Sequence, residues 1–267
     1  MPEARVPAVA FDHVTKRFGT AKPILESLSV SIQPGEFVSI VGPSGCGKST
    51  LLRLVSGLSP TTSGTVEVEG MTPKSAREIT SFIFQDPTLL PWRTVRRNVA
   101  LGLELEHTAR ERRDEIVSNL LTLVGLDHVA DSYPRQLSGG MKMRASIARA
   151  LASNPRVLLL DEPFAALDEI TRDRMNEELI RLYQQQSWTV LFVTHSVAEA
   201  VFLSTRILVL APHPGRLAHD IRVDLPANRT PETRRSEAYE RIVAQVSRTL
   251  RGVQYAEEAN ESSEATS

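Results

Sequence analysis

Residues Phe37 to Val55 read FVSIVGPSGCGKSTLLRLV, and this stretch decides the fold. It begins with an apolar run typical of a buried strand and ends with residues at the spacing of a helix. Between them lies the pattern G-x-x-x-x-G-K-[ST], in which backbone N–H groups and the start of the helix surround phosphate oxygens. A strand, a phosphate loop and a helix in this order predict an α/β nucleotide-binding core.

The phosphate loop contains several residues with an expected role in binding. Lys48 supplies a cation to the phosphates, and the Ser49 hydroxyl is a candidate ligand for Mg²⁺. Cys46 is either a small loop residue or a redox-sensitive thiol. The alternative to a nucleotide site is a structural glycine-rich turn, which the flanking strand and helix disfavour. The residues expected to contact the nucleotide here are Gly42, Pro43, Ser44, Gly45, Cys46, Gly47, Lys48, Ser49 and Thr50.

A second apolar run, Val157 to Leu160, ends in two adjacent carboxylates, Asp161 and Glu162. Ligands of α/β sheets bind at the carboxyl ends of the strands, so these acids are expected at the nucleotide. Asp161 fits a metal-coordinating role through water, and Glu162 can accept a hydrogen bond from an attacking water and polarise it. Two acids at the end of a strand can also be merely solvated, but the phosphate loop favours the catalytic interpretation.

The rest of the chain alternates short aliphatic runs with longer helical segments, which is typical of a parallel sheet covered by helices. Further alternating segments predict an antiparallel β layer. The fold class is therefore α/β, a P-loop NTPase core with an antiparallel β layer. The core strands are predicted at Phe37 to Val41, Phe82 to Phe84, Val157 to Leu160, Val190 to Val193 and Ile207 to Leu210. The antiparallel strands are predicted at Ala8 to Val14, Leu28 to Ile32 and Thr65 to Val68.

Strand signals are missing between about residues 87 and 153, where apolar residues follow helical spacing, so a helical subdomain is predicted to be inserted there. Within a single domain of residues 8–250, a C-terminal helix is expected at about 231–251, capped by Thr230. The polar, acidic segment 253–267 is predicted to be disordered.

Composition excludes several classes of function. The net charge of −1 and the pI of about 6.6 give no basic field for nucleic acid, so no nucleic-acid partner is expected. No run of apolar residues is long enough to span a bilayer, and the N-terminus lacks the features of a signal peptide, so membrane association is expected to come through partners. A single cysteine fits a reducing cytoplasm.

Phosphate loops occur in kinases, GTPases, helicases and recombination ATPases, so a third motif is needed to tell which class of nucleotide-binding protein this is. Residues 137–141 read LSGGM and stand shortly before the acidic strand. The segment closely resembles the signature motif of ABC ATPases, commonly LSGGQ, with Met141 in place of Gln. Ser138 can cap a helix whose free N–H groups and positive dipole end face an anion. In the family that anion is the γ-phosphate bound to the other subunit, which implies that Ser138, Gly139 and Gly140 contact ATP.

Four further residues match marks of ABC ATPases. Phe18 resembles the aromatic residue that stacks on adenine, although a lone aromatic is often a core residue. Gln85 resembles the glutamine that contacts Mg²⁺ and water and senses the membrane partner. Asp168 resembles the nucleotide-site residue that communicates across the dimer, and it can also cap the following helix. His195 resembles the switch histidine that hydrogen-bonds the γ-phosphate.

The resemblance covers nearly all of residues 8–215 and implies ATP and Mg²⁺ as cofactors. It implies that Mg²⁺ is held by Ser49, Gln85 and Asp161. It implies that hydrolysis is catalysed by Lys48, Gln85, Glu162 and His195.

The resemblance also implies partners. ABC ATPases work as head-to-tail dimers that close on ATP, so a second ATPase subunit is expected, as a homodimer or with a different subunit. The sequence LLPW ending at Trp92 and NVALGLEL after it, together with PFAALDEITR and VTHSVAEAVFLSTRILVL, look like the importer branch for nitrate, sulfonate, taurine and pyrimidine-type vitamin precursors. That branch implies two permease subunits, a periplasmic solute-binding protein and a peripheral place on the cytoplasmic face of the cell membrane. Trp92 is expected either to dock the permease or to anchor the subdomain core.

Three other functions fit the phosphate loop and are weighed against the importer. ATPases that remodel DNA or ribosomes carry coiled-coil insertions, cysteine clusters or two ATPase domains, which this chain lacks. A regulatory ATPase would need a signalling domain, for which the segment after Pro214 is short. An exporter subunit is disfavoured by the LLPW segment.

Overall fold

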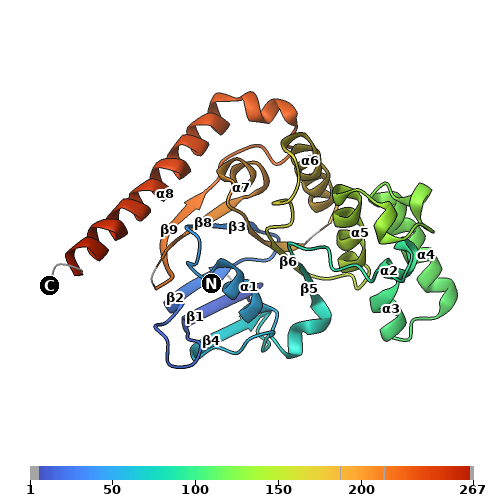
Figure 1. Ribbon diagram of the computed structural model, residues 1–267, viewed down its shortest axis with the longest axis horizontal. Coiled ribbons are helices and arrows are strands. Elements are labelled where there is room, and N and C mark those ends of the chain that lie inside the picture. The colour runs from blue at the N-terminus through green and yellow to red at the C-terminus, as the bar shows by residue number, and fades with distance from the viewer. Residues whose placement is uncertain (1–5, 187, 213, 265–267) are drawn as a thin grey trace, which may run out of the picture.

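The computed structural model describes residues 6–186, 188–212 and 214–264, and for 256–264 it describes the backbone alone. Two sheets stack on one another, helices cover the far face of the larger sheet, and a separate lobe of helices lies at one side (Figure 1). Within the described ranges no helix is both long and apolar enough to cross a membrane.

Among the described residues, the larger sheet has six strands in the order β5-β6-β7-β3-β8-β9. The five strands predicted for the core are confirmed and are mutually parallel. The sixth, β9, was not predicted, because most of its residues are exposed; it runs antiparallel to β8 at the edge. Their bounds are β3 Phe37–Val41, β5 Thr80–Ile83, β6 Val157–Asp161, β7 Thr189–Val193, β8 Arg206–Ala211 and β9 Arg216–Arg222.

The smaller sheet is antiparallel, as predicted, with the order β2-β1-β4. Helix α1 (Lys48–Val55), which follows the phosphate loop, lies between the two sheets, and its leucines share one apolar cluster with both. The phosphate loop is therefore anchored on a helix that is buried from two sides. The strand bounds are β1 Val9–Lys16, β2 Leu25–Ile32 and β4 Ser63–Val68.

The opposite face of the larger sheet is covered by α6 (Glu169–Gln185), α7 (Val197–Leu203) and α8 (Glu237–Glu264). The strands alternate their side chains between the two faces, so Phe37 and Val41 join this second cluster while Val38 and Ile40 face α1.

The inserted helical subdomain has its own apolar cluster, and it forms the lobe at the right of Figure 1. Its α-helices are α2 Val95–Val99, α3 Leu101–Leu105, α4 Arg110–Leu123 and α5 Gly139–Leu151, with short 3-10 helices η2 Asp127–Val129 and η3 Pro134–Gln136. The absence of strand signals in the sequence is thus explained by a unit built of helices.

The C-terminal segment differs from the prediction. Thr230 caps a short 3-10 helix, η4 (Pro231–Arg235), and α8 begins only after Ser236, at Glu237. Helix α8 also continues to Glu264, through most of the segment predicted to be disordered. Residues 256–264 contain alanine and glutamate and no glycine or proline, which favours the helical backbone over a break. Residues 265–267 of the predicted tail lie outside the described residues.

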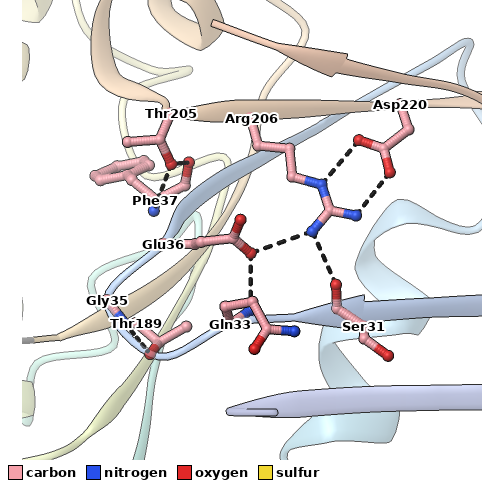
Figure 2. A network of polar contacts seen from close by, with 9 residues as sticks. All are labelled: Ser31, Gln33, Gly35, Glu36, Phe37, Thr189, Thr205, Arg206 and Asp220. Carbon is pink, nitrogen blue, oxygen red and sulfur yellow. Dashed lines mark hydrogen bonds and ion pairs between the residues drawn. The ribbon is translucent and has the colours of Figure 1, made fainter. Parts of the chain in front are cut away.

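A polar network joins the two sheets at the end opposite the phosphate loop (Figure 2). Arg206 on β8 makes a bidentate pair with Asp220 on β9, at 2.8 and 2.6 Å. The same guanidinium donates to the Ser31 carbonyl of β2 at 2.8 Å and to Glu36 at 3.1 Å. The hydrogen bond with Asp220 raises the pKa of Arg206 above its usual value.

We expect Arg206→Met to lower the free energy of unfolding by about 2 kcal/mol, because it leaves two carboxylates and a carbonyl without their shared donor. Urea denaturation of the full chain measures this loss. Arg112→Met is the matched control, since Arg112 and its partner Glu115 on α4 are both exposed and the loss should be about 0.5 kcal/mol or less. Equal losses in the two variants would contradict a role for the network.

Candidate active site

The phosphate loop lies between β3 and α1, and glycines allow its path. Gly45 and Gly47 have φ of 81° and 95°, a region that residues with a side chain rarely adopt. Lys48 is buried, and its ammonium group donates to the carbonyls of Gly42 at 2.9 Å and Pro43 at 2.8 Å. The lysine is thereby held against the loop, where its charge is available to phosphate oxygens.

A cavity of about 280 Å³ opens over this loop. Two side chains from other strand ends reach it: Glu162, which follows β6, and His195, which follows β7. The remaining lining residues are Ile24, Ser44, Gly45, Gly47, Lys48, Ser49 and Thr50. The parallel order β6-β7-β3 brings these three strand ends to one edge of the sheet, as ligand sites of α/β proteins require.

The two adjacent acids contact different residues. Asp161 accepts a hydrogen bond from the Ser49 hydroxyl at 2.8 Å. Burial raises the pKa of Asp161, an effect that the Ser49 hydrogen bond partly offsets. Glu162 turns away from the strand with φ of 48°, and its carboxylate lies 2.7 Å from Nε2 of His195. The histidine therefore fixes the carboxylate that faces the cavity.

Ser49 and Asp161 fit a Mg²⁺ ion. They place a hydroxyl and a carboxylate oxygen 2.8 Å apart beside the phosphate loop, and a cation there would offset the burial of Asp161. Mg²⁺ commonly takes one or two protein oxygens and completes its shell with water and substrate phosphates. Gln85, the third predicted ligand, lies exposed beyond the end of β5. It is not among the described residues that line the cavity.

Three predicted residues of the loop do not line this cavity. Gly42 and Pro43 instead offer their carbonyls to Lys48, and Cys46 is buried beneath the loop with its sulfur 3.9 Å from the lysine nitrogen. Phe18 lies apart on the surface, 47% exposed, with the Lys16 ammonium 4.6 Å from its ring centre. The alternative of a core aromatic at Phe18 is therefore wrong.

The remaining predicted residues lie outside the cavity. Ser138 is the N-cap of α5, as predicted, and accepts from the Met141 N–H at 3.3 Å. Asp168 is the N-cap of α6 and accepts from the Thr171 N–H at 3.0 Å. The two caps are neighbours, because an added Cβ would lie 3.5 Å from the Leu167 side chain at Gly139 and 3.2 Å from the Thr171 side chain at Gly140. One chain thus carries two separate sets of predicted nucleotide residues.

Sequence reasoning missed two residues that touch the loop. Ile24 lines the cavity, and Gly215 packs its backbone against Cys46 and Ile24. Gly215 exchanges backbone hydrogen bonds with the start of β2, which fixes its position. No local pattern marks either residue, because each reaches the loop from a distant part of the chain.

The chain is similar to known ATP-binding subunits of transporters. A family model described as "ABC transporter" matches residues 25–165. The chain is 44% identical to the nitrate import ATP-binding protein NrtD of Synechocystis sp., over 85% of this chain and 88% of that one. It is also 44% identical to the taurine import ATP-binding protein TauB of Escherichia coli O157:H7, over 77% and 80% of the two chains.

A solved structure with the same arrangement is the dimeric post-hydrolysis state of the ATP-binding cassette MJ0796, bound to ADP and Pi. It superposes with a TM-score of 0.72 at 32% identity, covering 82% of this chain and all of that one. The likeness therefore extends over most of the fold described above.

Proposed function

This chain belongs to the ABC transporter family and is an ATP-hydrolysing subunit, and from that premise we propose that it drives import of a small solute through permease partners. The observation that carries the proposal is the cavity in which Lys48, Glu162 and His195 meet beside the Ser49–Asp161 pair. The solute class we propose is that of nitrate, sulfonates, taurine and vitamin precursors, in line with the similarity to the import proteins NrtD and TauB.

Each residue around the cavity has a role that its geometry supports. The loop N–H groups and Lys48 bind the phosphates of ATP. Ser49 and Asp161 hold Mg²⁺, which neutralises charge on the transferred phosphoryl group when bound. Glu162 accepts a proton from the attacking water, and His195 keeps the carboxylate in position through the 2.7 Å contact. Gln85 and Phe18 remain proposed contacts to Mg²⁺ and adenine.

We further propose that two chains assemble head to tail. In one chain Ser138 and Asp168 lie outside the cavity, whereas the exposed N-terminus of α5 offers N–H groups suited to an anion. A second chain would bring these N–H groups to the γ-phosphate and complete the site. The MJ0796 cassette is dimeric with ADP and Pi bound, which supports a pair of chains, and closure on ATP would then convert binding into motion.

Trp92 is the proposed contact to the permease. Its side chain is 71% exposed, so the alternative of a core anchor is wrong. Buried Asn98 ties the loop beneath it together: its Oδ1 accepts from the Leu90 N–H at 2.7 Å, and its NH2 group shares two hydrogens among the carbonyls of Leu90, Arg93 and Thr94. An exposed tryptophan on a loop held by these hydrogen bonds suits the centre of a protein interface. The chain would then lie on the cytoplasmic face of the membrane, with the solute-binding protein contacting the permease from the other side.

Trp92→Ala is expected to lower the affinity of the full chain for washed membranes that contain its permeases by about tenfold or more, as loss of an interface tryptophan commonly does. Sedimentation of the chain with those membranes measures the bound fraction. Leu105→Ala is the matched control, since Leu105 is 74% exposed on the same subdomain. Unchanged binding of Trp92→Ala would rule out this docking surface.

A further inference from the structure

A second cavity, of about 260 Å³, adjoins the nucleotide cavity on the far side of Glu162 and His195. It lies where the loop after β6 meets the start of α7. Arg172 of α6 and Glu199 of α7 line it, together with Thr194. Arg172 and Glu199 belong to none of the motifs that identify the nucleotide site, and both line the same cavity as Glu162 and His195.

Glu199 holds both neighbours of His195 in place. The Thr194 hydroxyl donates to Oε2 of Glu199, and the Ser196 N–H donates to the Thr194 hydroxyl oxygen at 3.0 Å. Ser196 in turn accepts from the Glu199 N–H at 3.3 Å as the cap of α7. Since Glu199 is only 6% exposed, the segment that carries His195 is fixed from below by one buried carboxylate.

Arg172 holds the loop that leads to Asp168. Its Nη2 donates to the Leu167 carbonyl at 2.8 Å, and its Nε donates to the Phe164 carbonyl at 3.3 Å. Its own backbone N–H donates to the Asp168 carbonyl at 2.9 Å. The Arg172 side chain therefore ties both ends of the segment 164–167 to α6, beside the backbone hydrogen bonds of the loop itself.

Arg172 and Glu199 face each other across a gap. Nε of Arg172 lies 3.9 Å from Oε1 of Glu199, a buried oxygen with no well-formed hydrogen bond among the described side chains. Burial raises the pKa of Glu199, while Thr194, Arg172 and Asn176 lower it and Asp173 raises it further. Nε carries one hydrogen, so it can donate either to the Phe164 carbonyl or to Glu199, and the buried charge of Oε1 favours the second once the loop moves.

We propose that Arg172 and Glu199 are positioning residues that couple His195 to the loop 164–168. When the γ-phosphate of bound nucleotide forms a hydrogen bond with His195, the Thr194–Ser196 segment and Glu199 shift. The hydrogen bond from Nε of Arg172 then passes from the Phe164 carbonyl to Glu199. The loop is then released to move Asp168 toward the second subunit. This inference rests on the proposed function, because it takes His195 as the residue that senses the γ-phosphate.

Hydrogen exchange on the full chain tests the coupling without hydrolysis. With a non-hydrolysable ATP analogue and Mg²⁺, we expect the exchange of amides in 164–168 to change by about fivefold or more. Glu199→Gln replaces two accepting carboxylate oxygens by one accepting oxygen and an NH2 group, so Thr194 and Arg172 can no longer both donate to it, and that change should fall below about twofold. Amides in 42–50 should remain protected in both, because nucleotide still binds the loop.

Three further variants separate coupling from folding. Arg172→Gln removes the link from its other end and should give the same loss as Glu199→Gln. The double variant should lose no more than either single one, because both residues serve a single link. Glu177→Gln is the matched control, since Glu177 also lies on α6 but pairs with Arg234, 2.9 Å away, and should respond like wild type.

Steady-state kinetics adds a second measurement. Glu199→Gln should lower kcat about tenfold and leave the KM for ATP within about twofold, because binding is spared. The coupling would be overturned if the exchange of amides 164–168 in Glu199→Gln changed as much as in the wild type. It would also be overturned if the analogue protected amides 42–50 of the wild type but did not change the exchange of its amides 164–168. Failure of the analogue to protect 42–50 in the wild type would instead overturn the proposed nucleotide site, and the coupling with it.

Discussion

Glu162→Gln should lower the rate of ATP hydrolysis about a thousandfold while ATP still binds, because an amide cannot take a proton from the attacking water. The glutamine has nearly the same shape as Glu162, so the cavity and the phosphate loop should stay intact. If a second chain completes the site, the variant should also accumulate as an ATP-bound dimer, since the dimer reopens only after hydrolysis. Phosphate release measures the first effect and light scattering with ATP the second.

Glu78→Gln is the control for Glu162→Gln, because Glu78 is an exposed residue of the 3-10 helix η1 (Ser75–Ile79), outside the cavity. It should hydrolyse ATP at the wild-type rate. A Glu162→Gln variant that turns over at that same rate would remove the glutamate from the mechanism. If its turnover is lost but no dimer forms with ATP, the base assignment stands and the two-chain site does not.

Gly215→Ala should destabilise the chain by about 3 kcal/mol and weaken ATP binding about tenfold or more. A Cβ at this position would lie 2.1 Å from the Cys46 carbonyl oxygen and 2.7 Å from that of Ile24. Both atoms are backbone, so neither can rotate away, and the phosphate loop itself would have to move. Urea denaturation measures the stability and isothermal titration with ATP the affinity.

Gly102→Ala serves as the comparison for Gly215→Ala. Gly102 lies in α3 with no atom within 4 Å of an added Cβ, so alanine should stabilise the helix by up to about 1 kcal/mol. ATP affinity should not change, because α3 belongs to the helical subdomain. Wild-type affinity in Gly215→Ala would show that the loop adapts and that the contact with Cys46 is not needed.

Sequence patterns identified the helical subdomain and the two sheets, because helical and strand periodicities are local properties of the chain. These patterns did not predict the edge strand β9, since most of its residues are exposed and buried residues do not alternate with exposed ones along it. The composition of 253–264 indicated disorder, yet the same alanines and glutamates also form the end of α8. Charge and polarity alone did not distinguish a solvated helix from an unfolded tail.

By itself, the sequence determined the phosphate loop, the acidic strand end and the cap at Ser138, since each depends on residues within one short segment. Only the tertiary structure decided that His195 contacts Glu162, that Gly215 supports the loop and that Arg172 faces Glu199. Those contacts join segments far apart in the chain, and they follow from the strand order β6-β7-β3-β8. Strand order is set by packing of the whole core, which no local pattern encodes.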